Sequence, residues 1–378
     1  MKRVVLVLVI LFAIGLAAQE GNPSPVKYRR ATVAAVQAKV FTAGDEAASV
    51  QTDSSADAAF DPDPNAPQQP NAKASQSTPP PGDSKPKIPG SMVGYIDNPI
   101  VESEIRIRFD AAFEDRLPDR SEFFYAKCGC YRGLPSTNPA FDPNAPGPRP
   151  GIPNSINFQQ LYMNVEYSPQ RRFSAFAEVP IRWLQPQPQG TQAAFPNQSG
   201  LSDVTAGFKF AAVASENTYL TFQFKSYFPS GDASKGLGTN HYSVEPSLLM
   251  YHSFSDRFSL EGQIGDWHPI GGSAGVPTAS SEGFAGDVFF YGIGPSYKVY
   301  RRNRIQIAPV IELFGWHVLG GLQTGTPSDA SGIDIVNLKS GVRTYIGFHN
   351  SIYVGFGQAL THDDWYKHLV RLEYRYSF

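Results

Sequence analysis

The last eleven residues of the chain, His368 to Phe378, read HLVRLEYRYSF. One alternate set is apolar or aromatic, and it comprises Val370, Leu372, Tyr374, Tyr376 and Phe378. The other set is mostly charged, and it comprises Leu369, Arg371, Glu373, Arg375 and Ser377. Because successive side chains of a strand point to opposite faces, this stretch predicts a β-strand with one apolar and one charged face. Taken alone, it would also suit an edge strand of a soluble sandwich.

A second stretch with the same period is ESEIRIRFDAAFE, from Glu102 to Glu114. Its apolar alternates are Ile105, Ile107, Phe109, Ala111 and Phe113, and the charged alternates on the opposite face are Glu104, Arg106, Arg108, Asp110 and Glu114. A dense row of mixed charges opposite an apolar row is typical of a membrane barrel, which has lipid outside and a polar lumen inside. The chain therefore predicts an all-β fold, a transmembrane antiparallel up-and-down β-barrel.

Similar segments recur along the chain and give about twelve strands of the length that a tilted membrane strand needs. The predicted segments are 102–114, 156–168, 172–184, 202–214, 218–229, 242–254, 257–268, 286–300, 304–318, 335–348, 351–362 and 368–378. Short connections, such as Ser255-Asp256 and His349-Asn350, alternate with long ones, such as 115–155 and 269–285. Bacterial barrels have short periplasmic turns and long outer loops, so we expect the outer membrane, with the N-terminal segment in the periplasm.

The N-terminal part of the chain differs from the rest. Residues 1–18 have a basic start, a short apolar run and small residues at its end, as in a secretory signal peptide. Residues 19–90 are rich in Pro, Ala and Ser and predict a disordered periplasmic segment, and residues 91–378 predict the barrel. The formal net charge of -2 gives no indication of nucleic-acid binding.

Aromatic residues concentrate at the predicted strand ends. The four tryptophans (Trp183, Trp267, Trp316 and Trp365) fall at long-loop ends. Tyrosines and phenylalanines fall beside the short turns, and they are Tyr167, Phe173, Tyr219, Phe254, Phe258, Tyr297, Tyr300, Phe348 and Tyr353. Because amphipathic rings prefer the headgroup level, we expect two girdles that face the lipid.

Two features carry a resemblance to known families. The terminal aromatic residues Tyr376 and Phe378 resemble the end of bacterial outer-membrane barrels, which implies recognition by the barrel-assembly machinery. The stretch Gly200 to Gly272 resembles the outer-membrane family named for the MetA-pathway of phenol degradation. The matching residues are Gly200, Asp203, Gly207, Lys209, Pro229, Gly231 and Asp232. The resemblance implies transport of hydrophobic or aromatic compounds, but the family is not associated with the Pro-rich N-terminal segment or a Cys-Gly-Cys loop.

The charged alternates are the candidate pore-lining residues. They are Glu104, Arg106, Arg108, Asp110, Glu166, Glu178, Arg182, Lys209, Lys225, Glu245, Glu261, Glu312, Lys339, Arg343, Arg371, Glu373 and Arg375. They could set the selectivity of a water-filled pore, or they could form salt bridges that hold the barrel shut. Twelve strands give a backbone radius of roughly 12 Å, so we expect a narrow channel, or one gated by loop 115–155 or by the N-terminal segment.

Three other groups of residues could carry chemistry. Ser243 with His241 could form part of a lipid hydrolase, with Glu261, Gln263 or Asp266 on the next strand. His362, Asp363 and Asp364 could bind a cation at the outer rim. Cys128 and Cys130 could form a local disulfide in an exported protein. We nevertheless predict no enzyme activity, no cofactor, and no catalytic or metal site.

The sequence thus predicts a monomeric outer-membrane channel for passive uptake of a small hydrophobic or aromatic solute. Its expected partners are outer-membrane lipid, the barrel-assembly machinery and the solute. The alternatives are the lipid hydrolase and a structural envelope barrel that displays loop 115–155 to a partner.

Overall fold

The computed structural model describes residues 90–115, 136–137, 155–187, 196–239, 241–270, 286–302, 304–321 and 331–378. The signal peptide, residues 19–89, and the pair Cys128 and Cys130 lie outside these residues, as does most of loop 115–155. Within the described residues, no helix is long and apolar enough to cross a membrane. The regular structure described is β-strand, apart from one short 3-10 helix, η1 (Ala233–Lys235).

The strands are β1 (Glu104–Asp115), β2 (Ser155–Gln170), β3 (Phe173–Gln187), β4 (Gln198–Leu201), β5 (Val204–Ala214), β6 (Thr218–Phe228), β7 (Tyr242–Ser253), β8 (Phe258–Ile270), β9 (Val288–Tyr297), β10 (Tyr300–Arg302), β11 (Ile305–Val318), β12 (Asp334–Ile346), β13 (Asn350–Ala359) and β14 (His368–Ser377). The alternation of short turns and long connections follows from these bounds. Each strand pairs antiparallel with its neighbours.

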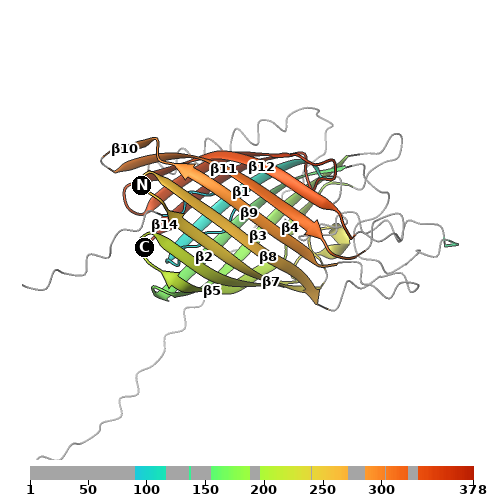
Figure 1. Cartoon of the computed structure of the whole chain (residues 1–378). Coiled ribbons are helices and arrows are strands. Elements are labelled where there is room, and N and C mark those ends of the chain that lie inside the picture. Colours follow the sequence, from blue (N-terminus) through green and yellow to red (C-terminus); the bar gives the residue numbers. More distant parts are fainter. Residues whose placement is uncertain are drawn as a thin grey trace, which may run out of the picture. The chain divides into compact units, whose positions relative to one another are not determined.

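The sheet closes on itself because β1 pairs with β14, from Glu104 opposite Ser377 to Phe113 opposite His368. The two short strands are fragments of longer ones. Both β4 and β5 pair with β3, and both β9 and β10 pair with β11. Counted together with the strands that they continue, the fourteen strands of the described residues form a closed twelve-stranded barrel. This confirms the predicted fold (Figure 1).

Alternation of burial follows the alternation of residue type. On β14, Val370 and Tyr376 are exposed on the outer face, whereas Arg371, Glu373 and Arg375 are buried inside the barrel. An apolar outer surface and a polar interior are what a closed sheet needs in lipid, because the closed sheet leaves no edge and the apolar residues face hydrocarbon. The two faces predicted from the C-terminal stretch are therefore confirmed.

Strand β1 departs from strict alternation near its long-loop end. The register between β1 and β2 shifts between Ala112 and Asp115, and Glu114 lies between them with a positive φ of 57°. This bulge turns Asp115 into the barrel, while Glu114 pairs with Lys367 at the rim (3.6 Å). The predicted inward position of Glu114 was therefore wrong, because a bulge adds one residue and reverses the faces beyond it.

Two of the family-like residues, Asp203 and Gly231, meet at the long-loop end of the barrel. The Asp203 carboxylate accepts hydrogen bonds from the Gly231 amide (2.9 Å) and from the Thr239 amide (2.7 Å). A side chain at Gly231 would place its Cβ 2.6 Å from the Leu237 carbonyl, so only glycine fits there. Next to it, the hydroxyl of Ser234 and then Lys235 lower the pKa of Asp232. The hydrogen bonds of Asp203 thus hold the connection between β6 and β7 against the start of β5.

Residues Gly90–Val101, which we call the inner segment, lie within the barrel. The segment precedes β1 and carries buried side chains at Met92, Val93, Ile96 and Ile100. Its backbone is hydrogen-bonded to side chains from β6, β8, β11, β12 and β14, strands that surround the lumen. The part of the chain predicted to begin the barrel therefore fills its interior before the first strand starts.

Candidate functional site: the barrel lumen

The charged residues predicted to line the lumen are all turned away from the outer surface. None is exposed, and all are buried except Arg106, Arg108, Glu178 and Lys225, which are half-buried. Those around one cavity are Arg106, Arg108, Asp110, Glu166, Glu178, Arg182, Lys209, Lys225, Glu245, Lys339 and Arg371. Those outside it are Glu104, Glu261, Glu312, Arg343, Glu373 and Arg375. Their role in selectivity stays a prediction.

Two carboxylates bind the backbone of the inner segment. Glu312 on β11 accepts hydrogen bonds from the amides of Gly94 (2.9 Å), Tyr95 (2.9 Å) and Ile96 (2.8 Å). Glu261 on β8 accepts one from the amide of Met92 (2.8 Å). Hydrogen bonds to a charged acceptor are stronger than neutral ones, and the inner segment has no strand partner of its own to satisfy these amides. Buried carboxylates therefore replace a neighbouring strand.

Guanidinium groups bind the carbonyls of the same segment. Arg343 on β12 donates to the carbonyls of Met92 (3.0 Å) and Val93 (2.6 Å), and Arg371 on β14 donates to that of Gly94 (2.6 Å). Arg343 also pairs with Glu373 (2.8 Å). Because the planar guanidinium presents several donors, one arginine can serve a backbone carbonyl and a carboxylate together.

Asp97 lies where the inner segment meets β6 and β8. Its carboxylate pairs with Lys225 (2.6 Å) and accepts a bond from Gln223 (2.8 Å), and its amide donates to Gln263 (2.7 Å). Beyond Asp97 the chain turns back, because the Pro99 carbonyl accepts from Thr221, near the short-turn end of β6. Of the inner segment, Tyr95 and Asp97 thus reach farthest from the short turns.

Beside these two residues lies a cavity of about 180 Å³, whose lining extends from Asp115 near the long loops to Glu166 and Lys209 near the short turns. Tyr95 and Asp97 contribute to its lining from the inner segment. The remaining lining comes from strands all around the barrel, together with Trp365 and Tyr366 from the connection before β14. The inner segment therefore occupies the part of the lumen beside this cavity.

One wall of the cavity is charged and comes from β1 to β3. Arg106 pairs with Glu178 (3.2 Å), and the Arg108 guanidinium lies 3.7 Å from the centre of the Tyr162 ring. Asp110 pairs with Arg371 through both carboxylate oxygens (each 2.7 Å). These pairs fix the charges in place, so the wall offers ordered polar groups without filling the space in front of it.

The facing wall is aromatic and comes from β8, β9 and β11. It contains Trp267, Phe290, Phe314 and Trp316, and Trp365 packs edge-on against Trp316 (6.5 Å). These tryptophans are buried, so the predicted lipid-facing girdle was wrong for Trp267, Trp316 and Trp365. Sequence position gives the height of a residue on a strand, but the parity of its register decides which face it occupies.

A single ammonium lies within this aromatic wall. Lys339 Nζ on β12 is 4.3 Å from the ring centre of Tyr95, 4.7 Å from that of Phe314 and 5.0 Å from that of Trp316. Contacts between a cation and ring faces are stabilising, above all where water is excluded. Lys339 therefore joins the aromatic wall to the inner segment.

The girdle at the short-turn end is largely as predicted. Tyr167, Phe254, Tyr297 and Phe348 are exposed, as are Phe258 and Tyr300, and Phe173 is half-buried. Tyr219 and Tyr353 are the exceptions, because both are fully buried inside the barrel. The Tyr353 hydroxyl donates to Glu312 (3.2 Å).

Sequence reasoning missed three acidic residues of the cavity, Asp97, Asp115 and Asp203. Asp97 belongs to the inner segment, and Asp115 follows the bulge. Asp203 was noted as a family-like residue, yet nothing in its sequence context pointed to the lumen. Sequence reasoning named the other charged residues of the cavity, because they alternate with apolar residues along their strands.

The possible hydrolase pair, His241 and Ser243, sits at the start of β7. His241 Nδ1 lies 2.9 Å from the Thr239 carbonyl, and its ring packs edge-on against Trp267 (5.8 Å). The Ser243 hydroxyl is buried and has no hydrogen-bond partner among the described residues. A serine nucleophile needs a hydrogen-bonded base, and that bond is not formed here.

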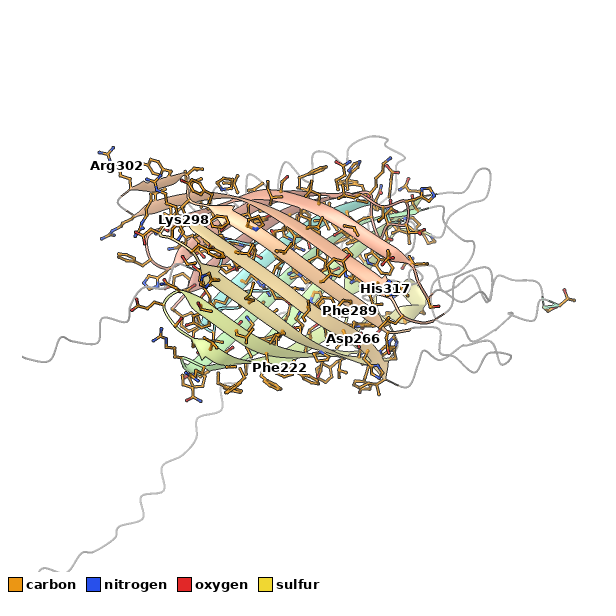
Figure 2. The ribbon with its side chains drawn as sticks, viewed as in Figure 1. Phe222, Asp266, Phe289, Lys298, Arg302 and His317 are labelled. Atoms are coloured by element: carbon orange, nitrogen blue, oxygen red, sulfur yellow. The ribbon has the colours of Figure 1, made fainter. Side chains whose placement is uncertain are left out.

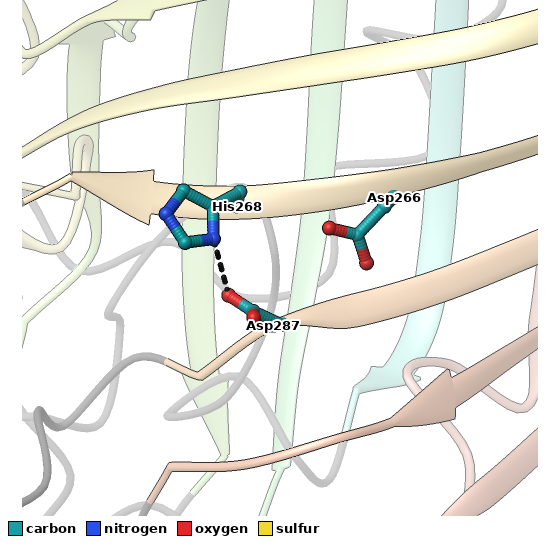
Figure 3. Close-up of side chains that lie close together, drawn as sticks. All are labelled: Asp266, His268 and Asp287. Atoms are coloured by element: carbon teal, nitrogen blue, oxygen red, sulfur yellow. Dashed lines mark hydrogen bonds and ion pairs between the residues drawn. The ribbon is translucent and has the colours of Figure 1, made fainter.

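A group of metal-ligating side chains lies on the long-loop end of β8. Atoms of Asp266, His268 and Asp287 that could bind a cation all lie within 4.8 Å of one another (Figure 3). His268 Nδ1 is already bonded to Asp287 (2.8 Å), and the group is partly exposed on the barrel rather than in the cavity. Of the residues considered from sequence, Asp364 is buried, whereas His362 and Asp363 are exposed.

A closed antiparallel barrel with an apolar outer surface and a charged interior defines an outer-membrane β-barrel protein. The model of the family described as "Putative MetA-pathway of phenol degradation" matches residues 161–265, which span β2 to β8. This match confirms the family resemblance found in the sequence. No curated protein matches the chain.

Solved structures of outer-membrane barrels are similar to this chain. The COG4313 outer membrane channel from Pseudomonas putida F1 has 13% identity and a TM-score of 0.47, over 74% of this chain and 96% of that one. The β domain of the Bordetella autotransporter BrkA has 13% identity and a TM-score of 0.43, over 73% and 100%. The NanC porin has 7% identity and a TM-score of 0.39, over 72% and 100%.

Proposed function

We propose that this protein is an outer-membrane channel for passive uptake of a small aromatic solute with a polar group. The observation that carries the proposal is the two-faced cavity, with Trp267, Trp316 and Phe314 on one wall and fixed charges on the other. Aromatic rings stack favourably on one another, and paired charges can hydrogen-bond a polar substituent. The match to the family model is consistent with this solute class.

In this mechanism the solute enters from the long-loop end and rests in the cavity above the inner segment. No bond is made or broken, and the concentration gradient supplies the driving force. Passage to the short-turn end requires the inner segment to move aside, because Met92 and Val93 are bonded across the lumen to Glu261 and Arg343. The periplasmic position of the N-terminal segment is part of the same proposal.

The test is single-channel conductance of the refolded protein without its signal peptide, in planar bilayers, with and without aromatic acids. We expect small conductance events that an aromatic solute shortens or blocks, and no such block by an aliphatic acid of similar size. Conductance that neither solute alters would contradict the proposed solute class. Complete silence, even after removal of the inner segment, would contradict the channel itself.

A further inference from the structure

The exposed arginines of the described residues all lie at the short-turn end of the barrel. They are Arg171, Arg172, Arg257, Arg301, Arg302 and Arg304. The exposed lysines are at the opposite end, where Lys235 pairs with Asp232 (3.0 Å) and Lys367 pairs with Glu114 (3.6 Å). The two ends therefore differ in the kind of cation they expose as well as in loop length.

Most of these arginines gather on neighbouring turns. Arg257 lies in the turn before β8, and Arg301, Arg302 and Arg304 lie in the hairpin of β10 and β11. We call these four residues the basic rim. Figure 1 shows the hairpin at the end of the barrel, and Figure 2 shows Arg302 there, with His317 at the other end. The turn beside Arg257 contributes one exposed carboxylate, Asp256, which lies 3.4 Å from Arg301.

Exposed aromatic rings surround the basic rim. Phe254 and Phe258 flank Arg257, and Tyr297 and Tyr300 flank the start of the hairpin. The Arg304 guanidinium lies 5.9 Å from the ring centre of Phe348 in the next turn. Because such rings settle at the headgroup level of a bilayer, the arginines beside them lie at the depth of the lipid phosphates.

We propose that the basic rim is a binding site for anionic phospholipid. Guanidinium groups bind phosphate in a bidentate manner, and basic residues beside a membrane surface are attracted to anionic headgroups. Three of the four arginines have no carboxylate within salt-bridge distance among the described residues, so the rim keeps a net positive charge. The lipid would lie against the barrel with its phosphate at Arg302 and Arg304 and its acyl chains on the apolar outer surface.

The test compares lipid retention by the purified full-length protein in a neutral detergent. Native mass spectrometry would count adducts of phosphatidylglycerol and of phosphatidylcholine with identical acyl chains. We expect the unchanged protein to prefer phosphatidylglycerol. In the triple variant Arg301→Gln, Arg302→Gln, Arg304→Gln, we expect that preference to fall by about tenfold or more, given the attraction of each basic residue to an anionic surface.

The matched control is Lys235→Gln with Lys367→Gln, which removes exposed positive charge from the other end, and its preference should be unchanged. An equal loss in the control would show a general charge effect and overturn the proposal. A triple Arg→Lys variant keeps the charge but loses the bidentate geometry, so its preference should lie between those of the unchanged protein and the triple Gln variant. Unchanged preference in the triple Gln variant, or displacement of the lipid by inorganic phosphate alone, would also overturn it.

Discussion

Two sides of the lumen use the same kinds of residue for opposite purposes. On the side of β8, β11 and β12, Glu261, Glu312 and Arg343 bind the backbone of the inner segment, and the space is filled. On the side of β1, Arg106, Arg108 and Asp110 pair with other barrel side chains beside a cavity of about 180 Å³. A charged interior therefore does not by itself indicate an open pore. The lumen is filled where the charged groups bind a peptide backbone, and space remains where they bind neighbouring side chains.

Removal of the inner segment should have the largest effect on ionic conductance, because it empties the filled side of the lumen. Deletion of residues 91–100 should raise ionic conductance by at least about tenfold, because the lumen of a twelve-stranded barrel is then obstructed only by side chains. Conductance in planar bilayers measures the change. Deletion of residues 50–80, which leaves the inner segment intact, is the control and should change conductance little. Equal conductance in both deletions would mean that the inner segment is not the barrier.

Weakening the contact between the barrel and the inner segment should have a smaller effect. In Glu312→Gln, one acceptor oxygen becomes a donor that faces the amides of Gly94, Tyr95 and Ile96. We expect this to weaken docking of the inner segment by about 2 to 3 kcal/mol and to increase the frequency of channel opening. Opening frequency in single-channel recordings is the measurement.

The control for Glu312→Gln is Glu178→Gln on the β3 side of the lumen, where the carboxylate pairs with Arg106 and contacts no inner-segment amide in the described structure. Its opening frequency should stay near that of the unchanged protein. If both variants open equally often, the difference between the two sides of the lumen has no functional consequence.

Solute binding should depend on the aromatic wall of the cavity. Trp316→Ala removes a buried ring of the cavity, and we expect an aromatic solute to bind about tenfold more weakly. Trp183→Ala provides the control, because Trp183 lies on the opposite face of β3 from the buried Arg182 and Leu184. Equilibrium dialysis with a labelled aromatic acid gives both affinities. Equal losses would place the solute outside the cavity.

Exposed ion pairs at the long-loop end of the barrel should contribute least to its stability. Lys367→Gln removes the pairing with Glu114, in which both side chains are nearly half exposed. Because solvent and salt screen such pairs, the stability should change by no more than about 0.5 kcal/mol. Unfolding in urea within lipid vesicles measures it. A loss several times larger would show that the bulge of β1 depends on this pair.

Much of the fold was predictable because one physical rule governs every strand. Lipid on one side and water or buried charge on the other impose a period of two, which the sequence records from Ile105 through Phe378. The same rule placed the charged candidates inside. It failed where the register shifts, at Glu114, and where height was used without parity, at Trp267, Trp316 and Trp365.

The sequence by itself determined the barrel, its strand order and the inward charges, because alternation is a local property that needs no distant contact. Only the tertiary structure decided that the inner segment occupies the lumen, since Gly90–Val101 has no periodic signal and its partners lie more than a hundred residues away along the chain. It likewise decided that Trp267, Trp316 and Trp365 lie along one wall of a cavity. Both features depend on closing β1 against β14, which brings residues from opposite ends of the chain around one enclosed space.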